Sequence, residues 1–137
     1  MGTWGRAAAV GLPADDAIWT MEVAPDDPKL IVASTFRGGV WRSVDGGASF
    51  QRTNNTWALD LQILPGGTVY VGGRGVFVSH DRGATFTGYQ HSLGYFPTSD
   101  VYGLAADPRD PRHVAIGLFS FGFQAAQLGT LFHDPPV

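Results

Sequence analysis

The acidic side chains of this chain are the first candidates for chemistry. A glycosidase needs two carboxyl groups that face each other across the bond it cleaves. Apart from the acids of recurring turn motifs, the sequence offers five carboxylates, Asp15, Asp16, Glu22, Asp60 and Asp100. They match no catalytic motif, and we assign no catalytic residue.

Two arginines and several aromatic side chains are candidates for ligand binding. Arg37 and Arg74 occupy equivalent Gly-rich turns of two repeated segments, and arginine suits bidentate contacts with carboxylate or phosphate groups. Aromatic rings beside polar groups suit sugar stacking and equally a protein interface. The predicted ligand-binding set is Phe36, Arg37, Trp57, Arg74, His91, Tyr95 and Phe96. The alternative is that these loop side chains are only solvated or hydrogen-bonded locally.

Several classes of function are disfavoured by composition. The net charge of −3 argues against a general nucleic-acid binder. No apolar run approaches the ~20 residues of a membrane span. Histidine spacing and motif searches predict neither a metal nor a cofactor. The absence of cysteine and the abundance of glycine and aromatics favour an extracellular or periplasmic location slightly, but the opening residues do not form a signal peptide, so the compartment stays open.

An internal repeat indicates the architecture. Nineteen glycines and nine prolines against one Glu and one Lys predict an all-β chain. The string SVDGGASF at 43–50 returns as SHDRGATF at 79–86, a spacing of 36 residues. A third copy begins with VYGLAADPRDPRHVAIGL at 101–118 and then loses the motif.

Within each repeat, alternating apolar and polar residues predict short antiparallel strands. Four such strands in ~40 residues match a β-propeller blade. A β-sandwich is the alternative, but it would not explain an octapeptide that recurs at a fixed position. We predict about three four-stranded antiparallel sheets, with a blade-completing strand at 2–9, blades at 17–54 and 58–90, and a degenerate blade at 100–133. In that last blade we expect strands at about 101–106, 113–119, 122–127 and 130–133.

The octapeptide resembles the Asp-box, or BNR repeat, of sialidase-like β-propellers. Its positions are filled by Ser43, Asp45, Gly47, Ser49 and Phe50, and again by Ser79, Asp81, Gly83, Thr85 and Phe86. We expect a structural role, in which the carboxylate accepts main-chain N–H groups of the turn and the glycine adopts a positive φ. The resemblance also implies that these turns lie on the face opposite the usual binding site.

The family includes sialidases, xyloglucanase-type hydrolases, sortilin-type receptors and photosystem-assembly propellers. Sialidases use an arginine triad, a tyrosine nucleophile with a glutamate partner, and an aspartate that acts as the acid. This chain offers two arginines in suitable turns, and its single glutamate, Glu22, has no matching tyrosine. We therefore predict a non-catalytic scaffold or binding subunit for an anionic or carbohydrate ligand or a protein. The alternatives are part of a sialidase-like or xyloglucanase-like hydrolase, or an accessory subunit that assists assembly of a complex.

Three blades are too few for a closed ring, because closed propellers typically have four to eight. We expect a protein partner or a second copy to complete it. Two copies placed head to tail would give about six blades, each N-terminal strand completing the last blade of its partner. A fragment of a longer propeller, or docking on a different protein, would also account for the open ring.

Overall fold

A computed structural model describes residues 2–4, 9–89, 99–120 and 127–133. The described strands form three separate antiparallel sheets. The first sheet contains β1 (Ile18–Ala24), β2 (Asp27–Thr35), β3 (Val40–Ser43) and β4 (Gln51–Asn54) in that order. The second contains β5 (Ala58–Ile63), β6 (Val69–Gly73), β7 (Gly75–Ser79) and β8 (Thr87–Gly88). The third has the order β11-β10-β9, with β9 (Ser99–Asp107), β10 (Asp110–Ser120) and β11 (Gln127–His133).

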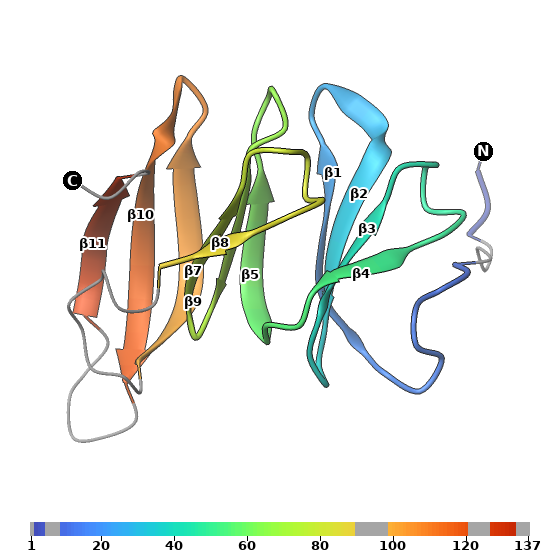
Figure 1. Ribbon diagram of the computed structural model, residues 1–137, viewed down its shortest axis with the longest axis horizontal. Coiled ribbons are helices and arrows are strands. Elements are labelled where there is room, and N and C mark those ends of the chain that lie inside the picture. Colours follow the sequence, from blue (N-terminus) through green and yellow to red (C-terminus); the bar gives the residue numbers. More distant parts are fainter. Residues whose placement is uncertain (1, 5–8, 90–98, 121–126, 134–137) are drawn as a thin grey trace.

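The three sheets lie side by side along the long axis of the molecule (Figure 1). The first strands of neighbouring sheets are adjacent, β1 to β5 and β5 to β9. Because the strands are antiparallel, the turns alternate between two ends. The β1–β2, β3–β4, β5–β6, β7–β8 and β9–β10 turns share one end, which we call the octapeptide end because both octapeptides lie there. The β2–β3 and β6–β7 turns and the β4–β5 connection lie at the opposite end.

The core consists of two apolar layers, each between neighbouring sheets. The first layer joins residues of the first and second sheets, including Leu30, Val32, Leu61 and Val71. The second joins the second and third sheets: Leu64, Tyr70, Val76, Val78, Val101, Leu104, Val114 and Ile116. Strand side chains alternate between faces, so the middle sheet contributes to both layers. This use of both faces is how blades pack in a propeller.

The third sheet is described only in part. Of the two strands expected at about 122–127 and 130–133, the second falls within β11, and the first lies almost wholly outside the described residues. The octapeptide that spaced the turns of the first two sheets is missing here, so the sequence carried no signal for the strand limits. No helix suited to crossing a membrane occurs in the part of the chain that is described.

The N-terminal segment contacts its own first sheet. Of the expected strand at 2–9, the structure describes residues 2–4 and 9, which are outside any strand. Val10 forms a parallel bridge with Ser49. Its N–H donates to Ala48 O at 3.1 Å, and its carbonyl accepts the N–H of Phe50 at 2.8 Å. These bonds place Val10 beside the first octapeptide of the same chain.

Candidate functional site

A pocket lies between the first and second sheets, at the end opposite the octapeptides. Its volume is about 490 Å³, and it is lined by Arg37, Asn55, Thr56, Trp57 and Arg74. Arg37 comes from the β2–β3 turn, Arg74 from the β6–β7 turn, and the other three from the β4–β5 connection. Equivalent turns of adjacent sheets therefore bring two arginines to one opening. This volume is within the usual range of small-ligand sites.

The turn that carries Arg37 is held by the acidic segment before β1. The Arg37 N–H donates to both carboxylate oxygens of Asp16, at 3.0 and 3.3 Å. Its guanidinium donates to Asp15 Oδ2 at 2.8 Å, with both side chains largely exposed. Burial would raise the pKa of Asp16, but hydrogen bonds from the Arg37 N–H, the Thr35 hydroxyl and the Ala17 N–H outweigh it, so the pKa lies below its ordinary value. The turn is thus fixed before any ligand binds.

The turn that carries Arg74 packs tightly against the β4–β5 connection. A Cβ atom on Gly73 would lie 1.8 Å from the Trp57 carbonyl oxygen, so only glycine allows this approach. Asp100, on β9, is 7% exposed. Burial raises the pKa of the Asp100 carboxyl, and the nearby charge of Arg74 opposes the shift. Arg74 therefore lies within electrostatic reach of the third sheet as well as the pocket.

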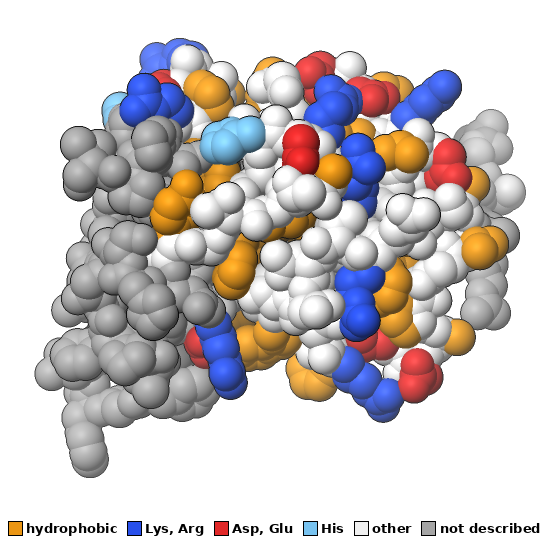
Figure 2. Space-filling model, viewed as in Figure 1, with side chains coloured by type: hydrophobic (Ala, Val, Ile, Leu, Met, Phe, Trp, Pro, Cys, Tyr) orange, Lys and Arg blue, Asp and Glu red, His pale blue; other side chains and the backbone are white. Residues whose placement is uncertain are grey.

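Basic and acidic side chains alternate at this end of the molecule on the face shown in Figure 2. The pocket therefore combines two cations with local carboxylates. Such a site favours a small anion that can contact both arginines directly. The net charge of the chain is −3, so long-range attraction of anions contributes little.

The seven expected ligand residues divide into three groups. Arg37, Trp57 and Arg74 line one pocket. Phe36 is outside that lining; its ring stacks on Trp19 with centroids 5.8 Å apart, and both rings are about half exposed. The other three, His91, Tyr95 and Phe96, lie outside the described residues.

Sequence reasoning did not single out Asn55, Thr56 or Trp19. Asn55 and Thr56 lie in a connection whose only distinctive side chain was Trp57, and Trp19 was taken as one member of an alternating strand. The stacked partner Phe36 could not be inferred, because the β1–β2 register has an irregularity between Ile18 and Thr20.

The acidic candidates on the inner strands have structural partners. Asp60 accepts the N–H of Leu61 at 2.9 Å and the N–H of Leu104 at 2.8 Å, which ties β5 to β9. Burial, followed by the negative charge of Asp60, raises the pKa of Glu22. Both carboxylate oxygens of Asp60 therefore accept main-chain hydrogen bonds. Glu22 differs, because its raised pKa favours the protonated form.

The two octapeptides have the same hydrogen-bond pattern. Asp45 Oδ1 accepts Ser43 Oγ at 2.8 Å and the Ser49 N–H at 2.9 Å, while Oδ2 accepts Ser49 Oγ at 2.5 Å. In the second copy, Asp81 makes the matching three bonds with Ser79 and Thr85 at 2.7, 2.8 and 2.5 Å.

These bonds determine the electrostatics and backbone of both turns. The side-chain and main-chain hydrogen bonds of Ser49 and Thr85 lower the pKa of Asp45 and Asp81 to about 2. Gly47 and Gly83 adopt positive φ values of 93° and 84°. Each carboxylate is therefore engaged inside its own turn, at the end of the molecule away from the pocket.

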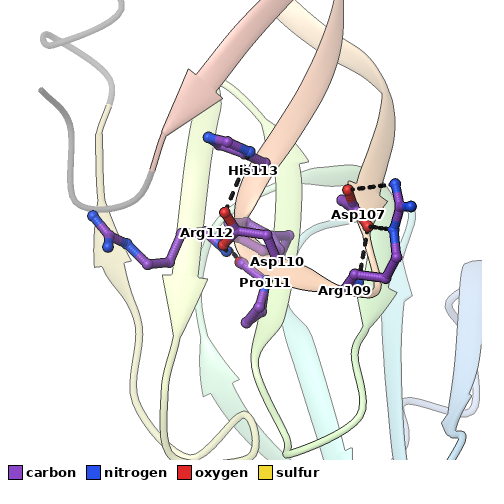
Figure 3. Close-up of polar contacts among 7 residues, drawn as sticks. Asp107, Arg109, Asp110, Pro111, Arg112 and His113 are labelled. Carbon is purple, nitrogen blue, oxygen red and sulfur yellow. Dashed lines mark hydrogen bonds and ion pairs between the residues drawn. The ribbon is translucent and has the colours of Figure 1, made fainter.

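Charged residues also gather in the β9–β10 hairpin (Figure 3), again at the octapeptide end. Asp107 accepts the Arg109 N–H at 2.8 Å and its guanidinium at 3.1 Å. Asp110 accepts the Arg112 N–H at 3.1 Å, and His113 Nδ1 lies 3.4 Å from its carboxylate. The same aspartate-to-amide bond, Asp27 with the Lys29 N–H at 3.0 Å, shapes the β1–β2 turn. These groups stabilise the hairpin itself.

Among the residues that the structure describes, no three His, Cys, Asp or Glu side chains are grouped so that they could hold a metal ion.

Two GH74 enzymes of known structure resemble the chain. The crystal structure of a GH74 enzyme from Niastella koreensis superposes with a TM-score of 0.59 and 19% identity, covering 81% of this chain and 18% of its own. An ancestral GH74 enzyme gives a TM-score of 0.60 and 14% identity, covering 93% of this chain and 19% of its own. No protein-family model and no curated protein matches.

The chain spans less than a fifth of each of these enzymes. At such low identity, the likeness shows the fold alone. The chain has an all-β fold of β-propeller blades, and its described residues form three of them, fewer than a closed ring contains.

Proposed function

We propose that this chain is a non-catalytic β-propeller segment of the Asp-box type that binds an acidic carbohydrate in the pocket of Arg37, Arg74 and Trp57. One observation carries the proposal: two arginines from equivalent turns and one tryptophan line the same opening. Arginine pairs with carboxylate groups through two parallel hydrogen bonds. An indole ring offers a flat apolar face to a sugar ring.

The absence of catalysis is argued from the carboxylates. Asp45 and Asp81 are bonded within their turns, and Asp60 bonds the main chain of two strands. A carboxylate occupied in this way is poorly placed to act as a nucleophile or base, which needs a lone pair directed at the substrate.

Binding of sialyllactose and lactose, measured by calorimetry, tests the proposal. Lactose is the matched neutral sugar. We expect sialyllactose to bind and lactose not to, with affinity falling as salt is added. Arg37→Gln and Arg74→Gln should each weaken binding about tenfold or more. Arg112→Gln is the control, because it removes the same charge at the octapeptide end. Equal binding of both sugars, or binding that survives both pocket substitutions, would contradict the proposal.

A glycoside hydrolase is the second candidate, and Glu22 favours it. The pKa of the Glu22 carboxyl is raised by burial and by the negative charge of Asp60. In glycosidases, a carboxyl group with a raised pKa serves as the acid beside an ionised carboxylate. Sialyl and β-glucan substrates would test this activity. Hydrolysis abolished by Glu22→Gln but retained by Arg37→Gln would favour the hydrolase over the binding protein. The same assay is applied to Asp60→Asn and Asp100→Asn, and their unfolding transitions are measured as well. A variant that loses hydrolysis but unfolds like the wild type has lost chemistry and kept its fold.

A role as an accessory subunit in a larger complex is the third candidate. It is favoured by the apolar side chains that the first sheet exposes on β1.

A further inference from the structure

The first sheet has one face covered and one face open. On β1 and β2, Glu22 pairs with Val32 and points toward the second sheet, where Val32 belongs to the first core layer. The pairs Met21–Ala33 and Val23–Ile31 therefore point the other way. We call the exposed part of this side the first-sheet open face: Ile18, Met21 and Val23, with the half-buried Ile31 beside them. Ala33, on the same side of β2, is buried. Three of its apolar side chains, Ile18, Met21 and Val23, are 48%, 43% and 49% exposed.

The same positions of the second sheet are fully covered. By strand register, Met21 corresponds to Leu61 and Val23 to Ile63. Met21 and Val23 pair with Ala33 and Ile31 on β2, just as Leu61 and Ile63 pair with Val71 and Val69 on β6. Leu61 is 0% and Ile63 is 6% exposed, because the first sheet packs on them. The first-sheet open face is therefore equivalent to the face of the second sheet that packs against the first sheet.

The contact between the second and third sheets shows what such a surface rests on. A Cβ atom on Gly72 would lie 2.7 Å from Val101 Cγ1 and 3.3 Å from Leu104 Cγ. Two apolar side chains of one sheet therefore sit directly on a glycine of the sheet before it. By register, Val101 and Leu104 of the third sheet correspond to Ile18 and Met21 of the first.

The third sheet repeats the glycine, and no described residue covers it. Gly117 pairs with Gly103 as Gly72 pairs with Asp60, so Gly117 is the register equivalent of Gly72. Among the described residues, a Cβ atom on Gly117 would meet only Gly103 main-chain atoms, at 3.9 Å, and one on Gly103 would meet nothing within 4 Å. A groove of about 280 Å³ lies there, lined by Gly103, Leu104, Ala105, Ala115, Ile116 and Gly117.

We propose that a second copy of this chain docks its first-sheet open face on this groove, with Ile18 and Met21 resting on Gly117 as Val101 and Leu104 rest on Gly72. At Gly117 two large apolar side chains would meet a glycine, as Val101 and Leu104 meet Gly72 between the second and third sheets. The contact is head to tail, and two copies close it reciprocally into a ring of about six blades, a number within the propeller range.

This association differs from exchange of N-terminal strands. Val10 is hydrogen-bonded to Ala48 and Phe50 of its own chain, and the proposed interface uses faces of whole sheets. It is also independent of the ligand pocket, which lies between the first and second sheets of one chain.

Light scattering after size-exclusion chromatography, at several protein concentrations, tests the proposal. We expect a mass of about twice 14.6 kDa. Met21→Glu and Gly117→Arg, purified separately, should each be monomeric. Mixed together, they should form a heterodimer, because one interface then joins opposite charges and the other is unaltered. Val44→Glu is the control, since Val44 is 58% exposed and belongs to the turn instead of the open face.

Circular dichroism on the monomeric variants establishes that they remain folded. A wild-type monomer at all concentrations would overturn the proposal and favour other blades as the occupant. A dimer that persists in Met21→Glu and Gly117→Arg would place the interface elsewhere and overturn it equally. Assembly into open chains without a closed dimer would also contradict the ring.

Discussion

Arg82 Nη2 lies 2.6 Å from Asp27 Oδ2, and this ion pair joins the second octapeptide to the β1–β2 turn of the preceding sheet. The carbonyl of Arg82 also accepts the Arg42 Nε–H of the first sheet, at 2.8 Å. The octapeptide turn is therefore an inter-sheet contact as well as a closed hydrogen-bond unit. Arg82 makes this contact with a φ of 61°, in the left-handed region that disfavours non-glycine residues.

Substitutions at Arg82 should separate backbone strain from the ion pair. Arg82→Ala removes the pair and keeps a side chain in the left-handed region. Arg82→Gly removes the same pair and relieves the strain, as Gly46 does at the equivalent position with a φ of 73°. We expect Arg82→Gly to be about 1 kcal/mol more stable than Arg82→Ala. Urea unfolding measures the difference, and equal free energies of unfolding would show that the turn relaxes in the alanine variant.

The stability of the protein should fall in acid because of the octapeptide carboxylates. The pKa of Asp81 is about 2 in the folded protein, below its ordinary value of 3.8. The folded state therefore favours the ionised form, and this contribution is fully present above about pH 4 and is lost as the pH falls toward 2. Asp81→Asn should flatten the dependence of the melting temperature on pH in that window.

Lys29→Gln is a suitable control for that measurement, because it removes a charged side chain but leaves every carboxyl group in place. An Asp81→Asn profile that parallels the wild type would mean that other carboxylates dominate the acid response.

The sequence predicted the sheets because turn chemistry recurs at a fixed spacing. Asp45 and Asp81 each need the same hydroxyls and glycine around them, so two copies of one pattern mark two equivalent turns. The proximity of Arg37 and Arg74 at the opposite end followed from topology, because the two residues occupy matching turns of adjacent sheets. That they bind a ligand stays a prediction.

What the sequence could not predict depends on details of strand register. The stacking of Trp19 on Phe36 results from an irregularity in the β1–β2 pairing, which alternation alone does not indicate. In the third sheet, Gly103 and Gly117 were indistinguishable from ordinary strand glycines until the register matched Gly117 with Gly72. Loss of the octapeptide removed the reference for placing β11.

The hydrogen bond from the Tyr70 hydroxyl to the Pro111 carbonyl should stabilise the contact between the second and third sheets. Tyr70 is fully buried, and its partner Pro111 is the second residue of β10. Tyr70→Phe keeps the ring and leaves the carbonyl without this donor, so we expect a loss of about 1–2 kcal/mol in the free energy of unfolding. Tyr102→Phe, at a side chain that is 47% exposed, should cost less than about 0.5 kcal/mol. Equal losses in the two variants would rule out a special contribution from Tyr70.

Gly73→Ala should damage both the fold and the pocket. The new Cβ atom would lie 1.8 Å from the Trp57 carbonyl oxygen, and this neighbour is main chain that cannot rotate away. Relief requires the β4–β5 connection to move, which shifts Trp57 relative to Arg74. We expect a loss of about 1–3 kcal/mol in urea unfolding, together with amide chemical-shift changes at Asn55 and Thr56. Gly2→Ala is the control, because a Cβ atom there meets nothing within 4 Å among the described residues, and the pocket residues should keep their shifts. A Gly73→Ala protein with wild-type stability and unchanged shifts at the pocket would show that the close approach is not needed to position the two arginines.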